Sequence, residues 1–154
     1  MNGEIIEKTE AFVKSELRSD PTGHDWFHIE RVRRNALSIC EQEQLGNRFI
    51  IELSALLHDI PDEKLNVSAE QGQNKLENFL QTLNIQESVK IHIRQIINTI
   101  SFKGGQNSNL TSIEAKIVQD ADRLDAIGAV GIARVFAYGG KKGQLILSPS
   151  INIR

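Results

Sequence analysis

Apolar residues recur at helical spacing in each long segment between Gly3 and Gly139. The clearest stripe consists of Val89, Ile93, Ile96, Ile97 and Ile100. A helix buries such a stripe by packing it against other helices. We therefore predict an all-α fold, a single bundle of about six helices.

One predicted helix leads directly into the dipeptide His58-Asp59 and ends at Pro61. Its buried stripe consists of Ile50, Leu53, Leu57 and Ile60. Adjacent helical residues point about 100° apart, so both side chains can reach one ion beyond the helix end. The alternative is a buried histidine that hydrogen-bonds its neighbour, and the dipeptide alone favours that interpretation.

The size and charge of the chain limit its function. Its 154 residues, 40% of them hydrophobic, are enough for one domain over residues 1–154. A formal net charge of −2 gives no overall attraction for a polyanion, which argues against a nucleic-acid partner. The only cysteine, Cys40, excludes a disulfide framework. No targeting segment or membrane span is visible, so we expect a cytoplasmic protein with no membrane partner.

Two further segments carry groups that can bind a metal. In GHDWFHIERV, His28 borders the buried stripe of a helix that Asp25 can cap, although alone it would be interpreted as a core histidine. Downstream, Asp122 and Asp125 share one face of a predicted long sixth helix. Burying two acids costs several kcal/mol unless a cation or hydrogen-bond donors satisfy them, so this face needs a partner.

The segments GHDWFH, LLHDI, SFKG and QDADRLDAIGA, in this order, resemble the HD-domain superfamily of metal-dependent phosphohydrolases. The resemblance runs from about Gly23 to about Gly140 and is nearest to a group of small bacterial hydrolases. It implies a metal ion held by His28, His58, Asp59 and Asp122. That ion would lie between the second, third and long sixth helices.

Two imidazoles and two carboxylates suit Mn²⁺, Fe²⁺ or Zn²⁺ better than Mg²⁺, which prefers all-oxygen ligands. We expect Mn²⁺, with Fe²⁺, Co²⁺, Zn²⁺ and Mg²⁺ as alternatives. Some superfamily members use further histidines to hold a second metal. His92 has no companion histidine here, so we interpret it as structural and expect one ion.

A hydrolase also needs a group that orients or deprotonates the attacking water. In the stringent-response alarmone hydrolases, which this chain resembles only at the HD elements, an acidic pair follows the HD motif after two residues. Asp62 and Glu63 occupy those places here, and Asp62 is our first choice as the base because it is shorter and more restricted. The alternative is that both are solvated turn residues.

Cations that hold a polyanionic substrate must be supplied locally in a chain of negative net charge. We predict that Arg31 and Lys103 contact substrate phosphate, whereas a surface ion pair and a loop without a role are the alternatives. His24 joins them as a substrate-binding residue. Asp125 either supports the metal ligands from behind or contacts substrate.

These features together predict a metal-dependent phosphohydrolase acting on nucleotides. The resemblance suggests cleavage of a nucleoside triphosphate to monophosphate and pyrophosphate. A 5′-nucleotidase or phosphodiesterase is the alternative within the superfamily, and a non-catalytic nucleotide-binding regulatory domain is the alternative outside enzymes. A homodimer stays open. Past Lys141 no helical period is visible, and relatives are expected to continue with C-terminal helices that this chain would lack.

Overall fold

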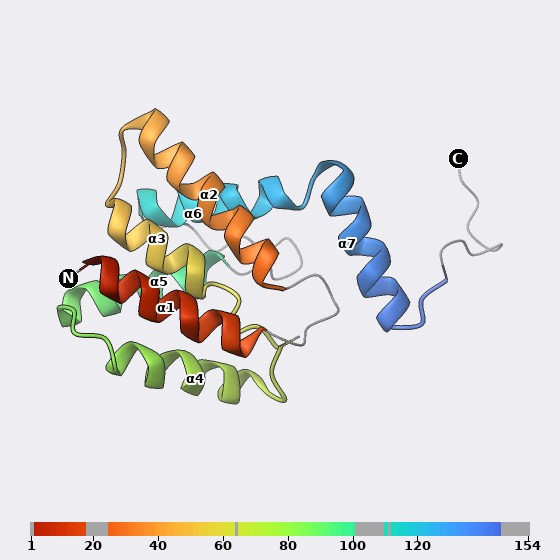
Figure 1. Ribbon diagram of the computed structural model, residues 1–154, viewed down its shortest axis with the longest axis horizontal. Helices are drawn as coiled ribbons and strands as arrows, with labels where there is room; N and C mark the ends of the chain where they lie inside the picture. Colours follow the sequence, from red (N-terminus) through yellow and green to blue (C-terminus); the bar gives the residue numbers. More distant parts are fainter. Residues whose placement is uncertain (1, 18–24, 64, 101–109, 111, 146–154) are drawn as a thin grey trace.

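The computed structural model describes residues 2–17, 25–63, 65–100, 110 and 112–145, and all regular structure in these ranges is α-helical (Figure 1). The all-α prediction is confirmed, with seven helices in the described residues where about six were expected. They are α1 Asn2–Glu16, α2 Trp26–Glu43, α3 Arg48–Leu57, α4 Ala69–Gln81, α5 Glu87–Ile100, α6 Ile113–Asp125 and α7 Gly128–Lys141. Among the described residues, none of these helices has the length and apolarity that a bilayer crossing requires.

Helix α3 is the centre of the bundle. Asn47 caps it, because its side-chain oxygen accepts hydrogen bonds from the backbone N–H groups of Phe49 and Ile50 at 3.1 and 3.3 Å. The helix packs against α1, α2, α5 and α6. Its buried residues are Ile50, Ile51, Leu53, Ser54, Ala55, Leu56 and Leu57. A helix buried on nearly all sides fixes the position of whatever follows its C-terminal end, and here that is His58-Asp59.

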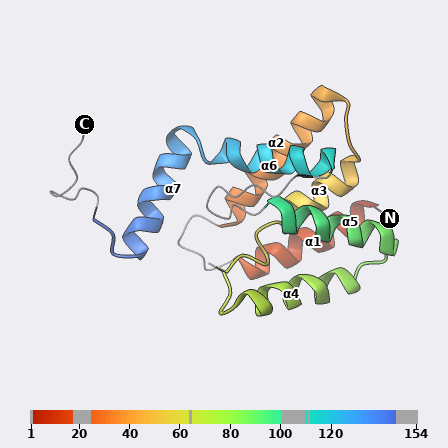
Figure 2. The same cartoon turned by 180° about the vertical axis from the view of Figure 1, so that it is seen from behind.

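Helices α1 and α4 form the outer layer on one side of the bundle (Figures 1 and 2). The rings of Phe12 in α1 and Phe79 in α4 stack with centroids 3.9 Å apart. Ser68 caps α4 by accepting a hydrogen bond from the backbone N–H of Gln71 at 3.1 Å. This layer covers the core on the side of α3 away from α2 and α6.

The prediction of one long sixth helix is wrong, because this segment forms two helices, α6 and α7. Helix α6 ends at Asp125 with Ala126 as its C-cap, and Ile127 is extended, with φ −111° and ψ 165°. Gly128 follows with φ +70°, a conformation that glycine adopts without the steric cost that other residues incur. Asp122 and Asp125 still share α6, but Ala129 does not continue their face as the helical spacing predicted.

Helix α7 stands away from the bundle in both views (Figures 1 and 2). It packs mainly against α6, and its one buried residue is Gly131. A Cβ atom on Gly131 would lie 2.2 Å from the carbonyl oxygen of Ala126, so only glycine allows this approach between the two helices. The α6–α7 turn, residues 126–131, therefore has a defined geometry although α7 buries little of its surface.

Two isoleucines of α5 test the packing. Ile97→Ala should lower the free energy of unfolding by about 2–5 kcal/mol, because Ile97 is fully buried and its loss leaves a cavity. Ile91→Ala removes the same atoms from the half-exposed face and should cost less than about 1 kcal/mol. Urea denaturation measures both, and equal losses would contradict the orientation of α5.

Candidate metal centre

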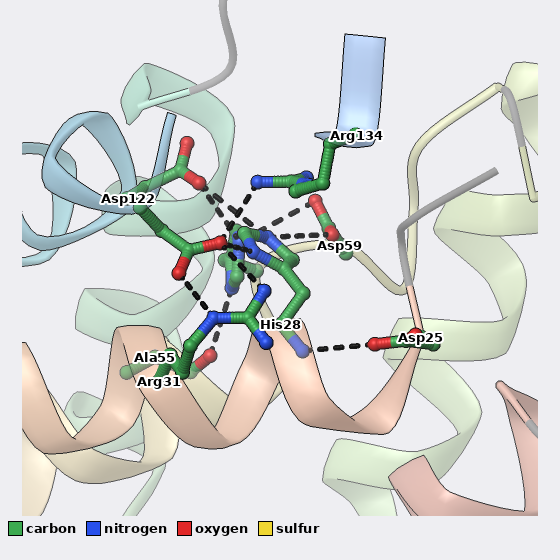
Figure 3. A network of polar contacts seen from close by, with 9 residues as sticks. Asp25, His28, Arg31, Ala55, Asp59, Asp122 and Arg134 are labelled. Carbon is green, nitrogen blue, oxygen red and sulfur yellow. Dashed lines mark hydrogen bonds and ion pairs between the residues drawn. The ribbon is translucent and has the colours of Figure 1, made fainter. Parts of the chain in front are cut away.

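Three helices bring the four predicted metal ligands together, and Figure 3 labels three of them, His28, Asp59 and Asp122. His28 lies in the first turn of α2, which begins where the Asp25 carboxylate accepts a hydrogen bond from the backbone N–H of His28 at 3.0 Å. His58 and Asp59 follow the C-terminal end of α3, and Asp122 lies in α6. The cap at Asp25 was predicted from the sequence and is confirmed.

Ligand atoms of His28, His58 and Asp59 all lie within 4.8 Å of one another, and Asp122 approaches both histidines. His28 Nε2 lies 3.3 Å from an Asp59 oxygen and 3.5 Å from an Asp122 oxygen. His58 Nε2 lies 3.4 Å from Asp59 and 3.7 Å from Asp122. Ligands about 2.1 Å from a tetrahedral ion are about 3.4 Å from one another. These separations therefore fit one shared metal ion.

His58 carries the observation that most directly tests whether a metal fits. Its Nδ1 lies 2.8 Å from the carbonyl oxygen of Ala55, which can only accept a hydrogen bond, so Nδ1 carries the proton. Its Nε2 is buried and has no hydrogen-bond partner among the described residues. A buried acceptor normally has a partner, and a metal ion bound by the Nε2 lone pair would supply one.

His28 is oriented in the same way by Asp125. Its Nδ1 lies 2.7 Å from Asp125 Oδ2, a contact that directs Nε2 toward Asp59 and Asp122. The Asp125 side chain is 3% exposed. A carboxylate behind a metal-binding histidine fixes the ring and its tautomer. The structure thus places Asp125 behind a predicted ligand, which is one of the two roles left open by the sequence.

Two arginines complete the surroundings of Asp125. Arg31 donates from Nε to Oδ1 at 2.5 Å and from a terminal nitrogen to Oδ2 at 3.1 Å. Arg134 of α7 donates to Oδ2 at 2.9 Å. Sequence reasoning missed Arg134, although it is the single charged residue in the apolar stretch GAVGIARVFAYGG. That isolated charge was the available signal.

The site is closed around its histidines and opens at Asp122. The side chains of His28 and His58 are 1% and 4% exposed, and Asp59 is 11% exposed. Asp122 is 37% exposed, so one side of the four-residue cluster faces solvent. The cluster is therefore accessible from the side of α6, while the imidazoles are shielded from water.

The carboxylates and imidazoles of the site shift one another's pKa values. Burial alone would lower the pKa of His58, but the nearby carboxylates of Asp59 and Asp122 raise it to about 10. Burial opposes ionisation of Asp125 as well, yet its contacts with His28 and Arg31 hold its pKa well below the usual value. The nearby carboxylates favour protonated imidazoles, so the imidazoles must lose these protons when they bind a metal.

The remaining residues singled out from the sequence lie outside the four-residue cluster or outside the described residues. Asp62 is half-buried in the turn after α3, where its backbone N–H donates to the carbonyl of Asp59 at 3.0 Å, and Glu63 is exposed. His24 and Lys103 lie outside the described residues. His92 Nε2 lies 3.6 Å from a Glu114 oxygen, which agrees with a structural role.

Comparisons with known proteins identify relatives of this chain. The pattern of the HD domain family matches residues 26–127. An uncharacterized protein of Bacillus subtilis, YpgQ, is 40% identical over 140 residues, which cover 90% of this chain and 68% of YpgQ. The crystal structure of YpgQ in complex with ADP matches with a TM-score of 0.75 at 39% identity, covering 93% of this chain and 72% of that chain.

Two further crystal structures are similar. A protein from Lactobacillus plantarum matches with a TM-score of 0.86 and 33% identity, over 98% of this chain and 70% of that chain. An HD-superfamily hydrolase from Bacillus thuringiensis matches with a TM-score of 0.76 and 51% identity, over 99% of this chain and 73% of that chain. The match in fold therefore extends beyond the residues of the family pattern.

Metal analysis tests the four-residue cluster. Purified protein should contain about one transition metal per chain, and His58→Ala or Asp122→Ala should lose it, because a cation holds buried carboxylates and imidazoles together. His92→Ala is the matched control, since His92 pairs with Glu114 away from the cluster. Full metal content in both ligand variants would contradict the assignment.

Proposed function

This chain belongs to the HD domain family of metal-dependent hydrolases, and we propose that it cleaves a nucleoside triphosphate to monophosphate and pyrophosphate. The observation that carries the proposal is the convergence of His28, His58, Asp59 and Asp122 around one position open to solvent. A nucleotide as the ligand is supported by the complex of YpgQ with ADP. We propose Mn²⁺ as the ion because the donors are mixed nitrogen and oxygen.

The charges around the cluster suit a polyanion. The two carboxylates of Asp59 and Asp122 balance one divalent cation. Behind them, Arg31 and Arg134 carry two positive charges against the single negative charge of Asp125. A divalent cation at such a site supplies an activated water and neutralises charge on a phosphoryl group. The excess of positive charge near the cluster would favour binding of a phosphate chain.

Arg31 remains our proposed phosphate contact on the described surface. Its side chain is 32% exposed even though two of its nitrogens bond Asp125. It lines a cavity of about 310 Å³ between α2 and the α6–α7 turn, together with Arg34 and Asn35. We propose Lys103 and His24 as additional substrate contacts on the strength of the sequence alone.

Asp62 and Glu63 are the proposed groups for orienting or deprotonating the attacking water. The turn that carries Asp62 is fixed from two sides. Its backbone N–H bonds the carbonyl of Asp59, and the Asn66 side-chain amide donates to the carbonyls of Ile60 and Asp62 at 2.8 Å each. This fixed turn holds Asp62 three residues after Asp59, a spacing that is compatible with a carboxylate that reaches water at the cluster and therefore supports Asp62 as the base.

Two alternatives follow from the same cluster. A 5′-nucleotidase or phosphodiesterase would need the same ion and the same local cations but would cleave a different bond. A regulatory domain would bind nucleotide and metal without turnover. The product formed separates the first alternative from our proposal, and the occurrence of turnover separates the second.

A screen of nucleotides tests the proposal. Metal-free protein supplied with Mn²⁺, Fe²⁺, Co²⁺ or Zn²⁺ should release pyrophosphate and a monophosphate from at least one nucleoside triphosphate, and His58→Ala should release neither. Chromatography identifies the products. Release of inorganic phosphate and a nucleoside from a monophosphate would favour a 5′-nucleotidase, and binding without any product would favour the regulatory domain.

Replacement of Asp62 tests the proposed base. Asp62→Asn keeps the size of the side chain but removes the basic oxygen, so turnover should fall by about 10²–10⁴-fold while metal and nucleotide still bind. Asp120→Asn is the control, because Asp120 is exposed on α6. Parent-level turnover in Asp62→Asn would exclude Asp62 as the base.

A further inference from the structure

We infer that Arg134 is a positioning residue of the metal centre, which reaches back from α7 to hold the carboxylate that orients His28. This inference rests on the metal-dependent part of the proposed function and is independent of the substrate. It gives a role to α7, which otherwise contributes little to the core.

The path from sequence to this contact begins in the α6–α7 turn. The positive φ of Gly128 turns the chain, and the missing side chain of Gly131 lets α7 approach the carbonyl of Ala126. Arg134 follows Gly131 by three residues, so both lie on the same side of α7. The close approach at Gly131 therefore directs Arg134 back toward α6, as Figure 3 shows.

The contact reaches the oxygen that matters for His28. Asp125 Oδ2 accepts from Arg134 at 2.9 Å and lies 2.7 Å from His28 Nδ1. Arg31 also donates to Oδ2, but its shorter bond goes to Oδ1. Loss of Arg134 would thus remove a donor from the oxygen that sets the direction of the His28 ring.

The surroundings of Arg134 fit a positioning role better than a surface ion pair. Its side chain is 19% exposed, whereas its neighbours on α7, Val135 and Phe136, are mostly exposed. Hydrogen bonds between charged groups strengthen when water is excluded. Removal of a group that orients a metal ligand typically lowers metal affinity by about 10–100-fold.

The test measures metal affinity instead of activity. Isothermal titration of metal-free protein with Mn²⁺ should give a dissociation constant about 10–100-fold higher for Arg134→Ala than for the parent. Arg134→Lys should recover part of the loss, since a single donor makes the contact with Asp125. Val135→Ala, on the same helix, should leave the constant unchanged. The visible spectrum of the Co²⁺ form should change in Arg134→Ala, because a misplaced His28 alters the coordination geometry.

A second variant reaches the same contact without changing any charge. Gly131→Ala should weaken Mn²⁺ binding, because the added Cβ displaces α7 from Ala126 and with it Arg134. If α7 acts on the metal through Arg134, Gly131→Ala should add almost nothing in the Arg134→Ala background. Full additivity of the two effects would overturn the inference.

Thermal melting of the metal-free proteins distinguishes a role of Arg134 in orienting His28 from a role in only attaching α7 to the bundle. If Arg134→Ala lowers the melting temperature but leaves the Mn²⁺ constant and the Co²⁺ spectrum unchanged, Arg134 only attaches α7 and the inference is wrong. A protein that binds Mn²⁺ as expected but hydrolyses no nucleotide would refute the proposed function and leave the inference standing.

Discussion

Two carboxylates, the buried Asp59 and the partly exposed Asp122, face two buried imidazoles, and this arrangement is the constraint on which the structure depends. Removing each isolated charge from water would cost free energy. Protonation would neutralise the carboxylates, but it would also remove the negatively charged oxygens that can bind a metal. Asp59 and Asp122 can stay ionised only where opposite charge is close, and the imidazoles provide it at 3.3 to 3.7 Å. This requires α2, α3 and α6 to meet at fixed distances, so the packing of the bundle and the chemistry of the cluster are one requirement.

Behind this cluster, Asp125 connects the metal centre to the outer part of the fold. Its carboxylate, on α6, is shared among an imidazole and two guanidinium groups from two other helices: His28 and Arg31 belong to α2, and Arg134 belongs to α7. These hydrogen bonds share the two oxygens of Asp125, so displacement of any one helix would change the contact between Asp125 and His28. The geometry of the α6–α7 turn can therefore influence His28, a proposed metal ligand that the turn does not touch.

The sequence was enough to predict most of the helices, because a buried stripe at helical spacing and a capping residue such as Asp25 are local signals. It also predicted that His28, His58, Asp59 and Asp122 belong together, through ordered segments that resemble one superfamily. The break at Ile127-Gly128 was not predictable from spacing, since the apolar stripe runs through it and a positive φ at Gly128 leaves no mark on periodicity. Arg134 was missed for the same reason, because its direction is set by that turn. Arg31 was recognised as a local cation, but its pairing with Asp125, 94 residues away, is a product of tertiary packing.

The cluster of Arg31, Asp125 and Arg134 is not explained by stability. Replacement of buried ion pairs by apolar side chains of similar volume is often neutral or stabilising, since the cost of removing charges from water offsets their attraction. Here that cost is concentrated on Asp125, which is 3% exposed, while the arginines are 32% and 19% exposed. An apolar residue at this position would avoid the cost and would pack equally well between α2 and α7. It could not accept a hydrogen bond from His28 Nδ1, however, and the imidazole would then be free to rotate its Nε2 away from Asp59 and Asp122. The buried charge of Asp125 is therefore explained by its contact with His28, which fixes the orientation of the imidazole ring.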